Sequence, residues 1–268
     1  MLTVPEYADQ IFENEKLKEK ASFLNKKKPL QPHKFWMPNS NYMVNQPDIN
    51  EKMRRILVDW LLKVHGKFKL LPETLYLTVN IIDRYLSQEI VTRKILQLIG
   101  VTAMHIACKY EEIYPPEAND FVYITDNAYT KKELLDTEYK ILKTLNFDLT
   151  FASAFRYLER LCTVSDNETL LPKAQKFMDQ CLSEYNMIQY EPSTLASGAL
   201  YYAHAVEKRK HSKLSHQSST SSLGKVRKNS LPEYNHSILS KLAGEAKISE
   251  NEIKKCAINI NIHVKGKQ

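Results

Sequence analysis

The chain lacks the sequence signatures of the common enzyme classes. Its 268 residues hold only six glycines, none of them in a phosphate-binding loop. There is also no HExxH zinc motif and no G-x-S-x-G nucleophile elbow. These absences argue against nucleotide-binding enzymes, zinc proteases and serine hydrolases. The sequence therefore predicts a protein that is not an enzyme and that needs no cofactor and no metal.

Cysteine patterns and long apolar runs are missing as well. The four cysteines, Cys108, Cys162, Cys181 and Cys256, are widely spaced and form no CxxC pair, so we expect buried thiols in a reducing compartment. The longest apolar stretch, 95–108, contains Gln97 and His105 and is shorter than the ~20 residues of a membrane span. Residues 1–12 contain acids and no long apolar core, unlike a signal peptide. We expect a soluble intracellular protein with no membrane partner.

The residues that are abundant favour helices. Hydrophobic residues make up 43% of the chain, and Leu, Lys, Glu and Ile recur with helical period almost throughout. The length suits two medium-sized domains. The net charge of +7 is spread over the whole chain and is weak evidence for a nucleic-acid partner. We expect helices near 49–69, 72–88, 94–113, 117–125, 131–146, 151–162, 169–187, 192–209, 233–244 and 250–264.

Capping signals mark several of the helix starts. Pro72 suits a first helical turn, and the Lys- and Pro-rich segment 20–46 indicates an irregular connector after a first helix. A side-chain cap followed three residues later by Glu predicts a capping box. The candidate pairs are Thr3 with Glu6, Asp48 with Glu51, Thr130 with Glu133, and Ser249 with Glu252.

A faint internal repeat supports two domains. A shift of 96 residues aligns Gly100, Ala103 and Ala107 with Ala196, Ala199 and Ala203. Small residues at this spacing let a neighbouring helix approach closely, which suits the central helix of a bundle. The same spacing is common in unrelated helices, so duplication and coincidence both remain open.

The segment 208–230 differs in composition from its surroundings. It is rich in Ser, Lys and Arg and has almost no large apolar residue. Such a segment buries too little surface to fold, so we expect a disordered insertion. Its basic clusters and Ser230 leave three interpretations open, namely a solvated loop, a nuclear-import signal and a phosphorylation site.

The segment 53–64, MRRILVDWLLKV, carries more apolar surface than an ordinary surface helix needs. It is either a core helix buried on all sides or a helix that shows an apolar face to a partner. The segment resembles the docking helix of the cyclins, and the same resemblance extends from Val4 to about Val264. Its most specific stretches are LYLTVNIIDRYL (75–86), LQLIGVTAMHIACKYEEIYPP (96–116), FVYITDNAYTKK (121–132) and EYKILKTLNFDL (138–149).

The resemblance is to A/B-type cyclins, nearer the mitotic B type. It implies an all-α fold of two cyclin-box five-helix bundles with an extra N-terminal helix. The expected parts are the N-terminal helix and connector (1–48), the first cyclin box (49–148) and the second cyclin box (149–268) with its insertion at 208–230.

The resemblance also implies two binding surfaces. Lys109 and Glu138 match residues that contact the backbone ends of a kinase helix, and the positions that accompany them are Ile106, Tyr110, Phe147, Leu149, Tyr7 and Ile11. A docking patch for short motifs in substrates or inhibitors is matched by Met53, Ile56, Leu57, Trp60, Leu96 and Gln97, with Arg93 at its border. Cyclin A-like proteins place acids near this patch, whereas this chain has Lys63 and Lys67, which argues against strongly basic motifs.

The function that the resemblance implies is that of a non-catalytic subunit. It would bind and activate a cyclin-dependent Ser/Thr protein kinase and recruit substrates during the cell cycle, at G2/M, in the nucleus and cytoplasm. No nucleic-acid partner is expected. The alternative is a general transcription factor like TFIIB, which has two cyclin-type repeats and binds DNA. Mitotic cyclins usually carry a degron-bearing tail before the first helix, and the expected helix here starts near Met1, so either the chain is a fragment or its turnover differs.

Overall fold

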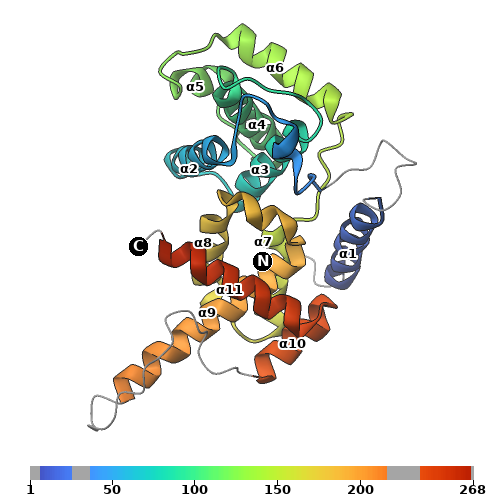
Figure 1. Ribbon diagram of the computed structural model, residues 1–268, viewed down its shortest axis with the longest axis vertical. Coiled ribbons are helices and arrows are strands. Elements are labelled where there is room, and N and C mark those ends of the chain that lie inside the picture. The colour runs from blue at the N-terminus through green and yellow to red at the C-terminus, as the bar shows by residue number, and fades with distance from the viewer. Residues whose placement is uncertain (1–6, 26–36, 216–235, 267–268) are drawn as a thin grey trace. The chain divides into compact units, whose positions relative to one another are not determined.

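The computed structural model describes residues 7–25, 37–215 and 236–266, which contain helices and no strand. This confirms the all-α prediction (Figure 1). The helices are α1 (Ala8–Asn25), α2 (Glu51–Phe68), α3 (Pro72–Leu86), α4 (Leu96–Glu111), α5 (Ala118–Tyr123), α6 (Lys131–Thr144), α7 (Ala154–Val164), α8 (Leu171–Leu182), α9 (Pro192–Ser215), α10 (His236–Ala246) and α11 (Glu250–Gly266). Short 3-10 helices are η2 (Tyr42–Asn45), η3 (Glu168–Leu170) and η4 (Tyr185–Gln189). None of the described helices is both long enough and apolar enough to cross a bilayer.

The chain divides into two compact units. Unit 1 comprises Met1–Ser153 and Leu182–Gln189, and unit 2 comprises Ala154–Cys181 and Tyr190–Gln268. The prediction of a single helix at 169–187 is wrong at its C-terminal end, because α8 stops at Leu182 and η4 follows. The reason is tertiary, since the segment 182–189 packs within unit 1 rather than continuing α8.

The predicted caps have mixed outcomes. Thr130 and Ser249 both form the reciprocal capping box, with Thr130 Oγ1 accepting from the Glu133 N–H at 3.2 Å and Ser249 Oγ accepting from the Glu252 N–H at 3.3 Å. The Asp48 prediction is wrong, because Asn50 caps α2 by accepting from the Met53 N–H at 3.0 Å. The Asp48 carboxylate instead accepts hydrogen bonds from Arg93. Thr3 and Glu6 lie outside the described residues.

Unit 1 is built around α4, which packs against α2, α3, α5 and α6 (Figure 1). Every residue from Leu98 to Cys108 is buried. Gly100 makes the approach of α2 possible, since a Cβ at this position would lie 2.6 Å from Leu57 Cδ1. The prediction that this segment is a central helix is confirmed.

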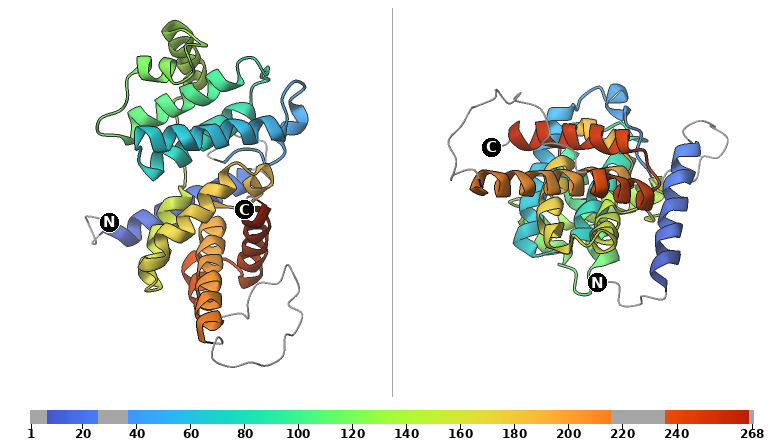
Figure 2. Two further views of the ribbon diagram at one scale, coloured as in Figure 1. Left: turned by 90° about the vertical axis from the view of Figure 1, so that its left-hand side faces the viewer. Right: turned by 90° about the horizontal axis from the view of Figure 1, so that it is seen from below.

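Unit 2 has the corresponding arrangement around α9, which packs against α7, α10 and α11 (Figure 2). Ala196, Ala199 and Ala203 are fully buried, as expected for a central helix. Phe177 of α8 and Tyr202 of α9 add a tilted ring pair with centroids 4.8 Å apart. A close approach to α11 is again at a glycine, where a Cβ on Gly198 would lie 2.8 Å from Cys256 Sγ and 3.3 Å from the Ala257 nitrogen.

Gly198→Ala should destabilise unit 2 by roughly 1–3 kcal/mol, because overpacking against the α11 backbone outweighs the better helix propensity of Ala. Gly244→Ala is the matched control, since its Cβ would meet nothing within 4 Å in α10. That control should be neutral or stabilising by up to about 1 kcal/mol. Denaturant unfolding of both variants checks the pair, and equal effects of the two substitutions would contradict the packing at Gly198.

The prediction of a disordered insertion at 208–230 is wrong for its first residues. Helix α9 continues through Lys208 to Ser215. Lys, Arg and Leu are good helix formers, and extending an existing helix costs far less than nucleating one, so composition alone misplaced the boundary. Residues 216–230 lie outside the described part of the chain.

Candidate functional site

Helix α2 is a core helix on one side and shows an exposed apolar face on the other, so each of the two interpretations holds in part. Leu57, Leu61 and Val64 belong to the buried core of unit 1, and Val58 is buried as well. On the other side Ile56 is 59% exposed, and Met53 and Trp60 are only partly buried. The helix therefore has both a core face and an apolar face that no described residue covers completely.

The predicted docking residues divide between these two faces. Leu57 and Leu96 are 5% and 6% exposed and belong to the core, so their side chains offer little surface to a partner. Gln97 is partly buried at the start of α4. Arg93 is exposed and pairs with Asp48 at 2.7 Å, which raises the pKa of the guanidinium and lowers that of the carboxyl group. Met53, Ile56 and Trp60 remain as the accessible apolar part.

A buried ion pair fixes α2 to α3. Arg54 is 1% exposed, and its Nε and Nη2 donate to the two Asp83 oxygens at 2.7 Å each. Tyr42 Oη donates to the same carboxylate at 2.8 Å. Burial is the largest single influence and lowers the pKa of Arg54, but the charge and hydrogen bonds of Asp83 together with those of Tyr42 outweigh it, so the pKa stands above its ordinary value. Burial next to Asp83 also raises the pKa of Tyr42 well above its usual range.

The same network holds the segment 182–189 in unit 1. Arg54 Nη1 donates to the Leu182 carbonyl at 3.0 Å, and the Met43 N–H donates to Tyr185 Oη at 2.9 Å. The Tyr185 ring meets Tyr42 edge to face, with centroids 5.2 Å apart. The helix that carries the apolar face is therefore positioned by contacts from α3, η2 and η4.

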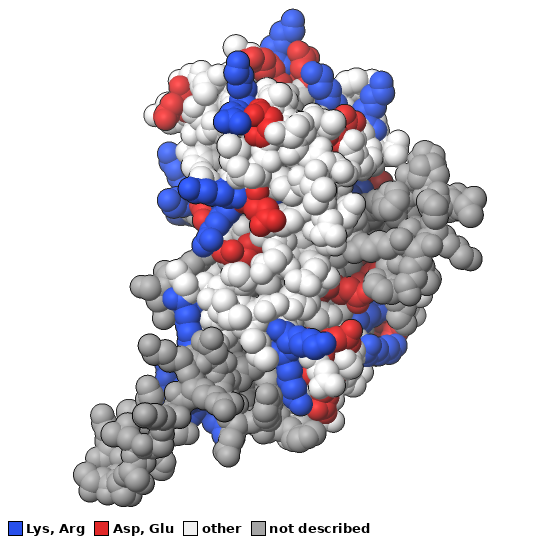
Figure 3. Space-filling view, in the orientation of Figure 1, with Lys and Arg blue, Asp and Glu red and all other residues white. Residues whose placement is uncertain are grey.

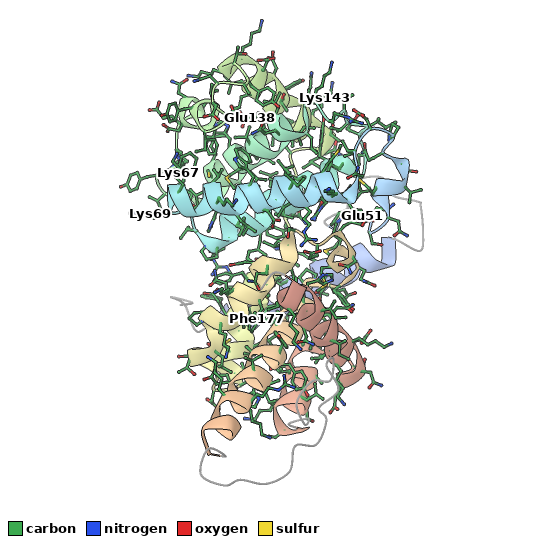
Figure 4. The ribbon with its side chains drawn as sticks, turned by 60° about the vertical axis from the view of Figure 1, so that its left-hand side comes forward. Glu51, Lys67, Lys69, Glu138, Lys143 and Phe177 are labelled. Atoms are coloured by element: carbon green, nitrogen blue, oxygen red, sulfur yellow. The ribbon has the colours of Figure 1, made fainter. Side chains whose placement is uncertain are left out.

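The second candidate surface contains an ion pair between α4 and α6. Lys109 Nζ lies against Glu138 Oε1, and Figure 4 shows Glu138 beside α4. The Glu138 side chain is 10% exposed, whereas that of Lys109 is 46% exposed. His105 lies behind the pair, with Nδ1 3.9 Å from Glu138 Oε1 and its ring 5.1 Å from that of Phe121. Burial lowers the pKa of His105, opposed by the Glu138 charge.

Exposed apolar side chains lie on both helices of this pair. Tyr110 of α4 is exposed, and Phe147 is 64% exposed with a left-handed φ of 57° just after α6. The sequence-based prediction missed Leu135 and Tyr139, which are exposed at the positions three before and one after Glu138. The available signal was a second apolar pair on α6, beside the face that buries Leu134 and Ile141.

The loop after α4 presents two further apolar residues that the sequence-based prediction missed. Glu112 accepts hydrogen bonds from the Leu71 N–H at 2.7 Å and from Thr74 Oγ1 at 2.5 Å, which fixes the start of the loop. Ile113 and Tyr114 follow directly and are 84% and 92% exposed. They stay in solvent although the loop is anchored, which is typical of residues that a partner covers.

The remaining predicted residues have different positions. Ile106 is 2% exposed and belongs to the core, so it is not available to a partner in this structure. Leu149 is partly buried against the same core. Tyr7 directly precedes α1 and Ile11 lies in its second turn, and both side chains are exposed.

Comparison with known proteins identifies the family. The sequence matches the family described as Cyclin, N-terminal domain over residues 26–150 and the family described as Cyclin, C-terminal domain over residues 152–267. The chain belongs to the cyclin family. A structure described as a viral cyclin from herpesvirus saimiri has the same fold, with a TM-score of 0.73 at 20% identity over 95% of this chain and 96% of that chain. This likeness confirms the predicted pair of cyclin-box bundles.

Its relatives place this cyclin with the B type. Cyclin-B2-2 of Oryza sativa subsp. indica is 43% identical over 203 residues, which cover 75% of this chain and 45% of that protein. The G2/mitotic-specific cyclin-B of Spisula solidissima is 53% identical over 163 residues, which cover 60% of this chain and 37% of that protein. The chain thus spans less than half the length of these two relatives. These similarities do not favour the TFIIB-like alternative.

Proposed function

We propose that this cyclin binds and activates a cyclin-dependent Ser/Thr protein kinase at G2/M, in the nucleus and cytoplasm, without supplying a catalytic residue. The observation that carries the proposal is the Lys109 and Glu138 pair among exposed apolar side chains that no described residue covers. In Figure 3 basic and acidic side chains are interspersed, and no continuous basic face is visible in this view. This distribution supports a protein partner over nucleic acid.

The chemistry of the pair suits the two ends of a helix. The first N–H groups and last C=O groups of any helix lack partners within that helix. The Lys109 ammonium can donate to the carbonyl end, and the Glu138 carboxylate can accept from the amide end. In the free cyclin the two charges neutralise each other, so a kinase helix would exchange one set of charge-assisted hydrogen bonds for another.

The surrounding apolar side chains would supply most of the affinity. Tyr110, Tyr139 and Phe147 are large, exposed and close in sequence to the pair, and buried aromatic side chains dominate the energetics of most interfaces. Holding the kinase helix would align the Lys–Glu ion pair that protein kinases need for phosphoryl transfer. The cyclin would thereby shift the kinase toward its active conformation.

Amide hydrogen exchange with and without a purified cyclin-dependent kinase tests this placement. We expect slower exchange in residues 106–114 and 135–149 when the kinase is bound. An unrelated Ser/Thr kinase at the same concentration is the control and should change nothing. Protection confined to unit 2 would contradict the proposed surface.

We further propose that the exposed face of α2 recruits substrates or inhibitors that carry short docking motifs. Its Met53, Ile56 and Trp60 are partly or largely accessible and lie on one side of the helix. A peptide that covers a central Trp gains apolar burial without disturbing the core face of α2. The docking surface and the kinase-binding surface use different residues, so each can be tested separately.

Trp60→Ala should weaken recruitment of docking-motif substrates about thirtyfold, because truncating a central interface aromatic costs ~2 kcal/mol. Phosphorylation of a short peptide without a motif should stay nearly unchanged. Steady-state kinetics with the two substrates measures both effects. Ile90→Ala, which removes an exposed apolar side chain elsewhere in unit 1, is the control. Equal losses for both substrates would contradict a docking role.

A further inference from the structure

The exposed face of α2 continues beyond its apolar part. Met53, Ile56, Trp60, Lys63 and Lys67 are separated by three, four, three and four residues, so they form one stripe along the helix. Ile56, Lys63 and Lys67 are exposed, and Met53 and Trp60 are partly buried. The N-terminal part of this stripe is apolar and its C-terminal part is basic.

Within the described residues no ion pair includes Lys63 or Lys67, and the nearest acid along α2 is Asp59, four residues before Lys63. Lys69 adds a third charge as the C-cap of α2, and Figure 4 shows Lys67 and Lys69 at this end of the helix and Glu51 at the other. A basic residue in the last turn offsets the helix dipole, which accounts for Lys67. Lys63 lies a turn earlier, next to Trp60, where dipole compensation is weak.

The spacing sets where a charged group of a bound peptide would lie. Trp60 and Lys67 are seven residues apart, which is about 10 Å along a helix. An extended peptide covers ~3.3 Å per residue, so a residue about three positions from an anchor on Trp60 reaches the two lysines. A carboxylate in this position would be attracted, and a Lys or Arg would be repelled.

We propose that the α2 face selects docking peptides whose apolar anchor is flanked by Asp or Glu and rejects peptides whose anchor is flanked by Lys or Arg. This specificity rests on the proposed docking function of α2 and adds the chemical class of its ligand. Opposite unit charges ~6 Å apart in water change affinity about threefold per pair. Two lysines facing two acids should therefore favour an acidic over a neutral flank by about tenfold at low salt.

The test uses the purified cyclin alone and fluorescein-labelled peptides that share one apolar Leu anchor. The second to fourth positions on both sides of the anchor are all Glu, all Ser or all Lys. Anisotropy titrations at 50 mM NaCl should rank the affinities in the order Glu, Ser, Lys, with about tenfold between Glu and Ser. At 500 mM NaCl the difference should fall to about twofold, because the Debye length shortens to a few ångströms.

Two charge-matched variants localise the effect. Replacing Lys63 and Lys67 with Glu should invert the ranking. Replacing Lys140 and Lys143 with Glu changes the net charge equally on the exposed side of α6, where Figure 4 places Lys143 away from α2, and should leave the ranking intact. Equal binding of the Glu and Lys peptides at low salt, or a ranking inverted by the α6 variant alone, would overturn the proposal.

The outcomes also separate this specificity from the proposed function. If all three peptides bind equally and Trp60→Ala abolishes their binding, docking on α2 stands and the acidic preference is refuted. If no peptide binds, both docking and its specificity are refuted. Kinase activation is measured independently, because it depends on the Lys109 and Glu138 surface.

Discussion

Replacing Asp83 with Asn should lower the free energy of unfolding of unit 1 by about 3–5 kcal/mol, which is the usual cost of removing one partner of a buried ion pair. The Arg54 guanidinium would keep its charge in a site that is 1% exposed. The Asn amide has one acceptor oxygen where the carboxylate has two, so it can accept only some of the hydrogen bonds that Asp83 accepts from Arg54 and Tyr42. The loss should loosen α2, α3 and the segment 182–189 together.

Denaturant unfolding followed by circular dichroism measures this effect. Asp48→Asn is the matched control, because Asp48 also binds an arginine but in an exposed position, where ion pairs contribute little. The double variant Arg54→Met with Asp83→Leu should recover much of the lost stability, since it removes both buried charges. A loss for Asp83→Asn as small as that of the control would show that the network does not hold unit 1 together.

Replacing Lys109 and Glu138 together with Ala should abolish kinase activation, with affinity for the kinase reduced by about a hundredfold or more. Both groups that can bind the ends of a kinase helix would be gone, and the apolar residues alone would not align it. The fold should persist because Lys109 is half exposed and no charge is left unpaired in the site.

A second ion pair provides the control for that experiment. Lys173 and Glu207 form a partly exposed pair in unit 2, and replacing both with Ala removes the same side chains from another place. Activation should then stay at the wild-type level, and the far-ultraviolet spectra of both double variants should match the wild type. Normal activation by the Lys109 and Glu138 variant would refute the proposed kinase contact.

Most helices, including the two central ones, could be predicted from the sequence because each has a local signal. Small residues at regular spacing indicated α4 and α9, and the capping boxes at Thr130 and Ser249 gave the starts of α6 and α11. The same local reasoning failed at Asp48, since a distant arginine competes for its carboxylate. It also failed at the end of α8. There the Leu182 carbonyl accepts from Arg54 of α2 and Tyr185 accepts from Met43 of η2, and the helix does not continue.

The site was predicted less completely because exposure is a tertiary property. Ile106, Leu57 and Leu96 matched functional positions yet lie in the core, while Tyr139 and Tyr114 were missed and are largely exposed. Periodicity shows which residues share a helix face but not which face a neighbouring helix covers. The Arg54 and Asp83 pair had a signal that went unused, because Arg54 shares a face of α2 with the apolar residues Leu57, Val58 and Leu61.

Titrating a purified cyclin-dependent kinase with this cyclin, and following phosphorylation of a generic peptide, tests the central claim most directly. The kinases of the source organism would be assayed one at a time, each purified without its own cyclin. We predict no phosphotransfer by the cyclin alone and a saturable rise in the activity of at least one kinase. Phosphotransfer by the cyclin alone, or no rise with any cyclin-dependent kinase, would contradict the account.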